Sequence, residues 1–201
     1  KRSAAVRAEW NRSVVDGWQI KTARNEHGDG DEVEARDGAV WCAYQQARAR
    51  MVPPAAWAPE IQALHEEFAA SRVRAHAIDF TGLVESALGA PPPYQTEVLF
   101  VDEAQDCTPL ELAVLRSWGE SCDHLVVAGD DQQAIYGFRG ATPDAFLDPP
   151  IPDAQKTFLR HSYRLHEALR VAALTYGSTM SRYERKDFEA HAPGGDVTVG
   201  Q

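Results

Sequence analysis

A chain of 201 residues with 44% hydrophobic residues is long enough to bury a core in one domain, with room for a helical insertion. The net charge of −10 argues against a freely exposed basic nucleic-acid surface, although a local groove can still be positive on an acidic protein. No stretch approaches the ~18 apolar residues of a membrane span, and the three cysteines are odd in number and lack metal-ligand spacing. These features argue against a disulfide framework, a zinc site and a membrane partner, and they predict a cytoplasmic protein.

The first part of the chain has the pattern of a helical region. Apolar residues spaced four apart predict an amphipathic helix over residues 3–20, and a second stripe predicts a helix over 59–74 that begins at a proline. A shorter helix is expected after Asp79, which is a good N-cap. Residues 25–38 are acidic and rich in glycine, and their spacing fits no calcium loop, so they predict a solvated loop.

After about residue 90 the pattern changes to alternating strands and helices. Continuous apolar runs predict strands buried on both faces over 98–101 and 125–128, and a third strand over 156–159. Helices are predicted over 110–118 and 165–176. A strand, a helix and a strand at this spacing indicate a right-handed parallel crossover, so the predicted fold class is α/β.

Polar residues follow the first two predicted strands directly, at the sheet edge where parallel sheets bind their ligands. Nucleotide hydrolysis needs a metal ligand, a group that positions water, a phosphate sensor and a cation. Asp102, Glu103 and Gln133 fit the first three roles, and Arg164 is a candidate arginine finger beside Tyr163, on which a purine could stack. Each residue alone has an ordinary structural explanation, such as an acidic helix cap or a packed tyrosine. Their order and spacing together favour a nucleotide site.

Three segments, taken in order, resemble the sequence motifs of one family. The superfamily 1A helicases of the UvrD/Rep/PcrA type have a motif II similar to DEAQD at 102–106 and a motif III similar to GDDQQAIYGFRGA at 129–141. Their motif IV is similar to LRHSYR at 159–164, although HS replaces the usual QN there. The segment IDF at 78–80 also resembles the one that precedes motif II, so the resemblance covers residues 78–176.

The resemblance implies a RecA-like parallel sheet of the P-loop NTPase type with a helical insertion in the N-terminal part. Residues 1–77 would form a helical insertion like subdomain 1B, and residues 78–160 would form part of motor domain 1A. Residues 161–201 would carry motif IV and cross into the second motor domain, 2A. The implied cofactors are ATP and Mg²⁺.

The resemblance also implies roles for the nucleotide-site residues. Asp102 would bind the magnesium ion, and Glu103 would act as the catalytic base toward water. Gln133 would sense the γ-phosphate, and Arg164 would contact it from the edge of the second motor domain. Tyr163 would stack on adenine.

A second set of roles concerns DNA. By the same resemblance, Tyr136 and Phe138 would stack on single-stranded DNA bases, and Arg139 would link the DNA site to the nucleotide site. Gln105 and Asp106 would take part in coupling the two sites. The implied partners are single-stranded DNA or a single-strand/double-strand junction, and the rest of a helicase chain, with its Walker A region and motifs V and VI.

The sequence contains no Gly-x-x-x-x-Gly-Lys-Ser/Thr loop, and none of its four lysines follows a glycine. We therefore expect an excised middle portion of a larger helicase rather than a short protein that has lost its ATP site, because the motif residues are intact in type. The isolated chain is not expected to hydrolyse ATP. Three functions stay open: part of a 3′–5′ translocase on single-stranded DNA, part of a helicase-nuclease subunit of the RecB or AddA type, and a non-enzymatic module that binds DNA or a protein.

Overall fold

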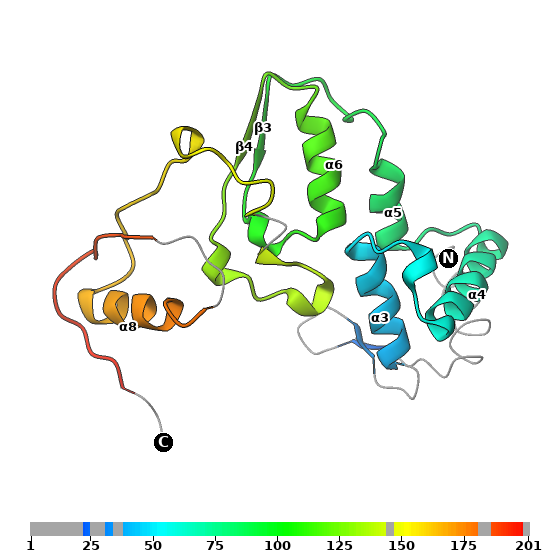
Figure 1. Cartoon of the computed structure of the whole chain (residues 1–201), viewed down its shortest axis with the longest axis horizontal. Coiled ribbons are helices and arrows are strands. Elements are labelled where there is room, and N and C mark those ends of the chain that lie inside the picture. The colour runs from blue at the N-terminus through cyan, green and yellow to red at the C-terminus, as the bar shows by residue number, and fades with distance from the viewer. Residues whose placement is uncertain (1–21, 25–30, 34–37, 144–146, 181–185, 199–201) are drawn as a thin grey trace.

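The computed structural model describes residues 22–24, 31–33, 38–143, 147–180 and 186–198 (Figure 1). The helix predicted over residues 3–20 lies outside the described residues, as does most of the predicted loop over 25–38. Two short strands, β1 (Thr22–Arg24) and β2 (Asp31–Val33), pair antiparallel with each other. The loop prediction was therefore wrong for the residues of β2, because strands of three residues are too short to show an alternating pattern.

Three helices follow the β1–β2 pair in the chain: α3 (Gly38–Ala49), α4 (Pro59–Ala75) and α5 (Phe80–Ala87). A single 3₁₀ turn, η2 (Pro54–Ala56), lies between α3 and α4. The α5 helix begins as predicted, because the Asp79 carboxylate accepts a hydrogen bond from the Gly82 amide at 3.1 Å. The structure thus confirms both helices expected here and adds α3, which the sequence pattern did not single out.

An aromatic core joins α3 to α4. It is built on four buried side chains, Tyr44, Trp57, Leu64 and Phe68. The Tyr44 ring meets the rings of Trp57 and Phe68 edge to face, at centroid distances of 5.8 Å. Burial raises the pKa of Tyr44 to about 12, and its hydroxyl lies 3.0 Å from Nδ1 of His65. The buried phenol therefore keeps a polar partner inside an otherwise apolar cluster.

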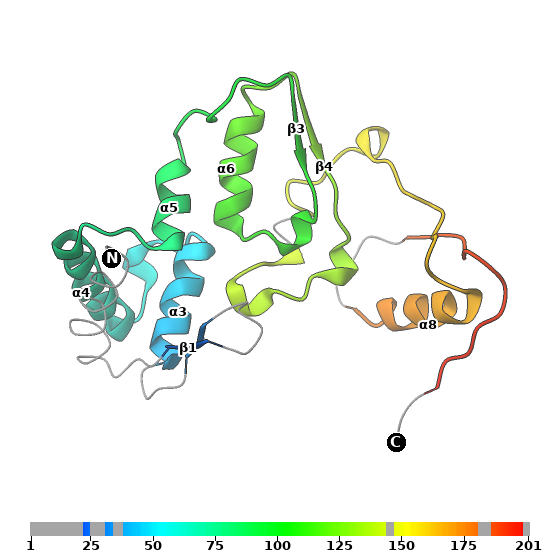
Figure 2. The same ribbon diagram turned by 180° about the vertical axis from the view of Figure 1, so that it is seen from behind.

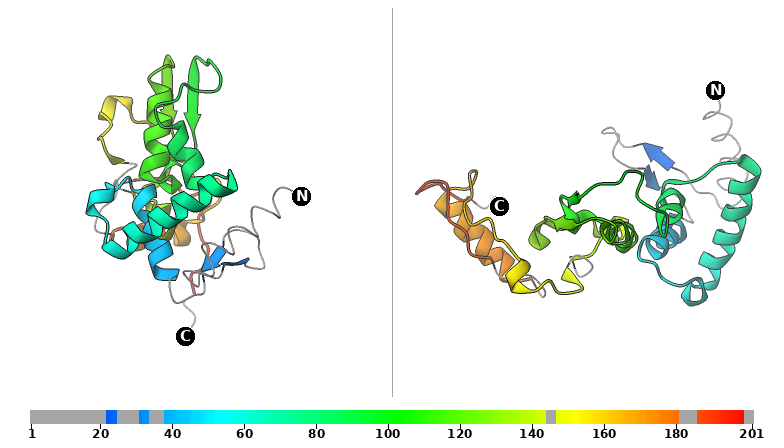
Figure 3. Two further views of the ribbon diagram at one scale, coloured as in Figure 1. Left: turned by 90° about the vertical axis from the view of Figure 1, so that its right-hand side faces the viewer. Right: turned by 90° about the horizontal axis from the view of Figure 1, so that it is seen from above.

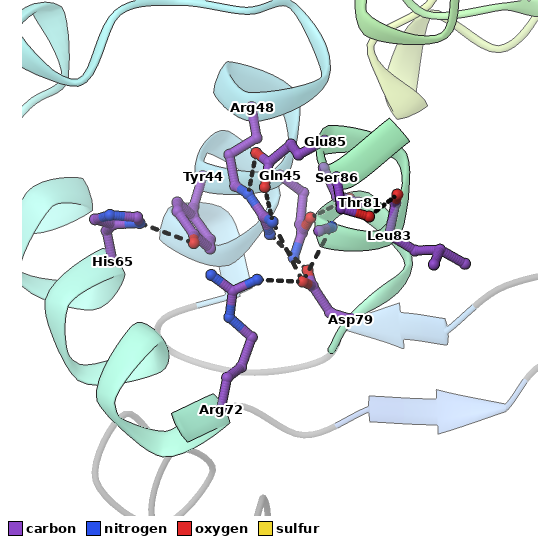
Figure 4. Close-up of polar contacts among 11 residues, drawn as sticks. Tyr44, Gln45, Arg48, His65, Arg72, Asp79, Thr81, Leu83, Glu85 and Ser86 are labelled. Atoms are coloured by element: carbon purple, nitrogen blue, oxygen red, sulfur yellow. Dashed lines mark hydrogen bonds and ion pairs between the residues drawn. The ribbon is translucent and has the colours of Figure 1, made fainter. Parts of the chain in front are cut away.

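A buried arginine connects the three helices (Figure 4). Arg48 on α3 is only 4% exposed, and its guanidinium donates to Asp79 at 2.5 Å and to Glu85 on α5 at 2.7 Å. Arg72 on α4 donates to the same Asp79 carboxylate at 2.7 Å. Burial would raise the pKa of Asp79, but hydrogen bonds from Arg48 and the charges of both arginines outweigh it and hold the pKa below its usual value. Because a buried charge is costly without a partner, these pairs fix the three helices relative to one another.

Replacing Asp79 with asparagine tests this network through its pH dependence. A lowered pKa in the folded state means that the Asp79 carboxylate stabilises the fold above the unfolded value of ~3.9, and that this contribution is lost as the pH falls through the folded pKa. We expect Asp79→Asn to lower the free energy of unfolding by about 3 kcal/mol at pH 7, and by progressively less below about pH 4. Urea denaturation between pH 3 and pH 7 measures this, with Asp123→Asn at an exposed position as control. An equal loss at every pH would contradict the ionic role.

The middle of the chain contains a pair of parallel strands. The strands β3 (Val98–Val101) and β4 (His124–Val127) are paired from Val98↔His124 to Val101↔Val127. The crossover between them is α6 (Pro109–Gly119), which begins with a reciprocal capping box. The predicted parallel crossover is confirmed, with each element within about two residues of its expected bounds.

The prediction that these strands are buried on both faces was wrong for this chain. The α6 helix covers one face, where Val101, Ala104 and Leu112 form a second core. On the other face, Phe100 is 73% exposed and Val126 is 42% exposed. An apolar run shows that both faces of a strand are apolar, but it does not show that the same chain provides the cover for both.

The predicted third strand was also wrong. Residues 156–160 carry no strand or helix, and Leu159 is 91% exposed. Within the described part of the chain, no strand pairs with this segment, so its backbone has no ladder to join. The helix expected next is present as α8 (Glu167–Gly177).

Three views show how these parts lie in space. In Figure 2 the chain runs from α4 and α3 through the β3–β4 pair to α8, and the view from above in Figure 3 places α4 and α8 at opposite ends. Short 3₁₀ turns occur at η3 (Ala104–Asp106), η4 (Asp131–Gln133), η5 (Gly137–Arg139) and η6 (Asp153–Gln155). Cys42, Cys107 and Cys122 are all unpaired. Among the described residues, none of the helices is long and apolar enough to cross a membrane.

Candidate functional site

The two carboxylates predicted at the end of β3 are exposed and follow the strand directly. Asp102 Oδ1 accepts a hydrogen bond from the Glu103 amide at 2.9 Å, which leaves Asp102 Oδ2 without a partner among the described residues. Glu103 has a φ of 51°, in the left-handed region that residues other than glycine rarely adopt. Backbone in this region is strained, and such positions cluster at functional sites. The turn at Glu103 therefore ends the strand abruptly and leaves the carboxylates accessible.

Gln105 joins the ends of the two strands. Its side chain is buried, and Nε2 donates to Glu103 Oε2 at 2.7 Å. The same amide accepts, through Oε1, a hydrogen bond of 2.9 Å from the backbone N–H of Asp130, just beyond β4. A primary amide can donate and accept at the same time, which a carboxylate cannot do. One side chain thus connects the two polar clusters that follow β3 and β4, which were predicted to lie at the same edge of the sheet.

Asp130 organises the turn that follows β4. Its carboxylate accepts a hydrogen bond from the Gln132 amide at 3.1 Å and from Gln133 Nε2 at 2.6 Å. Lys186 also donates to this carboxylate and to that of Asp131. Burial would raise the pKa of Asp130, but the hydrogen bonds from Lys186 and Gln133 outweigh it and hold the pKa below its usual value. Asp130 therefore stays ionised and fixes the Gln133 side chain.

Lys186 was not predicted from the sequence. It lies 55 residues beyond Asp131 in the chain, and no local pattern around it indicates a charged contact with this turn.

A second unexpected feature is Asp106, whose Oδ1 is buried and accepts no hydrogen bond within the described part of the chain. Buried acceptors of this kind are uncommon, and they mark strained or functional positions.

The residues predicted to contact DNA form one exposed loop around η5. Tyr136 and Phe138 lie with their ring centroids 5.9 Å apart, and Phe138 is 70% exposed. The Arg139 guanidinium lies over the Tyr136 ring, 5.7 Å from its centroid. The structure thus brings all three predicted side chains together on one surface.

The α3 helix supports this loop from below. Gln46 Nε2 donates to the backbone carbonyl of Phe138 at 3.0 Å. Gly140 ends η5 with a φ of 100°, and a Cβ at Gly140 would lie 3.0 Å from the Cβ of Ala49. The loop is therefore held on a helix that the Arg48 network fixes in turn, and this support was not predicted from the sequence.

The predicted motif IV residues lie apart from the other site residues. Tyr163 and Arg164 are both exposed, and His161 contacts the Tyr163 ring edge to face at 4.6 Å. Ser162 Oγ accepts a hydrogen bond from the Leu165 amide at 3.0 Å, which shapes the turn before α8. Within the described ranges, no hydrogen bond or ion pair joins the Arg164 side chain to Glu103 or Gln133. The structure therefore unites motifs II and III and leaves motif IV separate.

Comparisons with known proteins show which of them this chain is similar to in sequence. Residues 58–150 match the UvrD/REP helicase N-terminal domain, and that range contains both strand ends and the aromatic loop. The ATP-dependent DNA helicase UvrD2 of Mycobacterium tuberculosis is 30% identical over 196 residues, which cover 79% of this chain and 28% of that protein. The chain belongs to the UvrD-like superfamily 1 helicases.

Two further UvrD-like relatives are also similar to this chain in sequence. The putative ATP-dependent DNA helicase YjcD of Bacillus subtilis is 24% identical over 197 residues, which cover 90% of this chain and 25% of that protein. The ATP-dependent DNA helicase PcrA of Leuconostoc citreum is 26% identical over 147 residues, covering 67% of this chain and 20% of that protein. The chain thus spans about a quarter of the length of these curated UvrD-like relatives.

Replacing Gly140 tests how the loop around η5 is held. We expect Gly140→Ala to destabilise the fold by about 1–3 kcal/mol, because an alanine at this φ is strained and its Cβ would crowd Ala49. Gly137→Ala is the matched control, since a Cβ at Gly137 meets no atom within 4 Å. Urea denaturation of both variants measures the difference, and equal losses would show that Gly140 does not anchor the loop.

Proposed function

We propose that this chain is the part of an ATP-dependent DNA helicase that positions water for ATP hydrolysis and reports hydrolysis to a DNA-binding loop. The observation that carries the proposal is the Gln105 amide, which bonds both to Glu103 and to the turn that leads into the aromatic loop. The names of the UvrD-like relatives support the same activity. A RecA-like motor domain 1A over residues 78–160, a helical insertion over 1–77 and a crossing into domain 2A over 161–201 belong to this proposal.

The end of β3 fits a magnesium ion. Mg²⁺ is usually held by one or two carboxylates, with phosphate oxygens and water completing the octahedron. Asp102 offers one exposed carboxylate with a free oxygen, which suits such a site, and the described residues contain no cluster of three or more acidic, histidine or cysteine side chains that would suit a metal held by protein alone. Asp102 would hold the ion, and the ion would neutralise charge on the ATP phosphates.

Glu103 is the proposed general base. Its carboxylate is exposed to water on one side and receives the Gln105 amide at 2.7 Å, which orients it without neutralising it. Gln133 would contact the γ-phosphate by donating its second Nε2 hydrogen, since the first is donated to Asp130. Tyr163 and Arg164 would complete the site, as the adenine stack and the arginine finger, when their segment moves toward Glu103.

The DNA side of the proposal rests on two neighbouring aromatic rings, of which Phe138 is exposed and Tyr136 is half-buried. Single-stranded nucleic acid is bound without sequence preference by stacking bases on such side chains. Tyr136 and Phe138 would supply the stacking surface, and Arg139 would supply a cation beside it. The partner would be single-stranded DNA or its junction with a duplex. Asp106, with its unpartnered buried oxygen, would join Gln105 in coupling this loop to hydrolysis.

Two alternatives from other classes stay open. Part of a helicase-nuclease subunit of the RecB or AddA type would carry the same site, and a nuclease domain encoded in the same gene would identify it. A non-enzymatic module that binds DNA or protein would lack a phosphate-binding loop in the parent gene as well. The 3′–5′ direction and the cytoplasmic setting are expectations from the family and from the cysteine content.

Glu103→Gln tests the nucleotide side. The 201-residue chain alone is expected to show no DNA-stimulated ATPase, because it contains no phosphate-binding loop. In a helicase-length protein that contains this chain, Glu103→Gln is expected to lower kcat for ATP by about 10²–10⁴-fold while ATP binding is kept, because only the base is removed. Glu120→Gln, at an exposed position after α6, is the control. Turnover by the isolated chain that disappears in Glu103→Gln would contradict the first expectation.

Phe138→Ala tests the DNA side. We expect it to weaken binding of a fluorescent oligothymidylate by about 1–3 kcal/mol, the value of one base-stacking contact. Fluorescence anisotropy at one fixed salt concentration measures the affinity. Phe80→Ala is the matched control, because Phe80 is similarly exposed, at 76%, and lies on α5 away from the loop. Equal affinities for the two variants would rule out DNA binding over this loop.

A further inference from the structure

The segment that follows α8 returns to the turn after β4. Lys186 places its ammonium on the carboxylates of both Asp130 and Asp131. The Lys186 side chain is 19% exposed and that of Asp131 is 1% exposed, so this contact is largely closed to water. A charge-assisted hydrogen bond in such a setting is stronger than one on an open surface. A lysine beyond motif IV therefore holds the first residues of motif III.

A second contact brings the same part of the chain to this turn. Gly177, the last residue of α8, is buried, and a Cβ at that position would lie 3.0 Å from Gln132 Oε1. Figures 1 and 2 show α8 beside the chain that follows β4. Gly177 and Lys186 thus contact consecutive residues of one turn, and the two are called the C-terminal clasp. The close approach at Gly177 is possible because glycine has no side chain.

The C-terminal clasp connects to the proposed base through an unbroken series of direct hydrogen bonds. Lys186 donates to Oδ1 of Asp130, and Oδ2 of the same carboxylate accepts from Gln133 Nε2 at 2.6 Å. The Asp130 amide donates to Gln105, whose own amide donates to Glu103. A continuous chain of contacts therefore runs from the segment after motif IV to the end of β3.

We infer that Lys186 is a positioning residue that sets the orientation of the Gln133 side chain from the segment beyond α8. With Lys186 bound to Oδ1, the Asp130 carboxylate is fixed so that Oδ2 accepts the Gln133 amide. Held in this way, the Gln133 amide donates one Nε2 hydrogen to Asp130 and leaves the second hydrogen for a phosphate. The inference rests on the proposed function for the role of Gln133, and it gives the two parts of the proposed motor a direct ionic link.

Amide hydrogen exchange on the 201-residue chain tests the contact without any need for activity. Lys186→Ala is expected to speed exchange of the Gln132 amide, which donates to Asp130, about tenfold, the size expected when a charge-assisted hydrogen bond is lost. Lys186→Arg is expected to keep exchange near the wild-type rate, because it keeps the charge. Lys156→Ala is the matched control, since the Lys156 side chain is 21% exposed and pairs with Asp153 elsewhere.

Three results would overturn the inference: unchanged exchange in Lys186→Ala, an increase no larger than in Lys156→Ala, or equally fast exchange in Lys186→Ala and Lys186→Arg. If Lys186→Ala does not fold, Lys186→Met keeps the apolar stem without the charge and is judged by the same criteria. Circular dichroism establishes that each variant is folded before exchange is measured.

ATP turnover in a helicase-length protein then separates positioning from general support. Lys186→Ala is expected to lower kcat about tenfold with KM for ATP changed less than about twofold, because it acts on Gln133 rather than on nucleotide binding. Lys186→Arg is expected to restore kcat. If Glu103→Gln abolishes turnover but Lys186→Ala changes neither exchange nor kcat, this inference fails and the proposed function stands. If exchange changes as expected but no helicase-length protein hydrolyses ATP, the proposed function fails and the contact stands.

Discussion

One buried amide determines the arrangement of the candidate site. A parallel strand pair brings two strand ends to the same edge of a sheet, but it does not by itself connect the two turns beyond those ends. Gln105 makes that connection, because its amide donates to the carboxylate after β3 and accepts from the backbone after β4. Burial strengthens both bonds and makes each costly to lose. A change that moves the Asp130 amide would therefore alter its hydrogen bond to Gln105, the side chain that also holds Glu103.

The helical part of the chain gives the aromatic loop a fixed base. Arg48 lies on α3, and its charge is neutralised by the carboxylates of Asp79, just before α5, and Glu85, on α5. Separating the two helices would leave a buried charge without its partners, which is costly. The same helix supports the Phe138 carbonyl through Gln46 and packs against Gly140. A DNA-binding loop on this support would transmit force to the body of the protein rather than fold away from it.

The sequence was most informative where chemistry is local. Apolar runs, the Asp79 cap and the order of motif residues predicted the β3–α6–β4 unit, α4, α5 and the site residues at both strand ends. Prediction from the sequence failed where the structure depends on contacts between residues that are far apart in the chain. The segment over 156–159 has the composition of a strand, yet no described strand lies beside it. Lys186 and Gln46 act through contacts over 55 and 92 residues, which no local pattern reveals.

The acidity of the chain and its proposed contact with DNA are compatible for a physical reason. Across residues 129–141 the sequence has one cation, Arg139, against two aspartates, so this loop can neutralise few phosphates. Binding that relies on phosphate neutralisation would need several lysines or arginines in a row. Stacking needs none, because every base offers a flat face to an aromatic ring. Both carboxylates of the motif, Asp130 and Asp131, are bound by Lys186, which leaves the exposed part of the loop to Tyr136, Phe138 and Arg139. A loop built this way would bind bases through their faces, and such binding is compatible with the net negative charge of the chain.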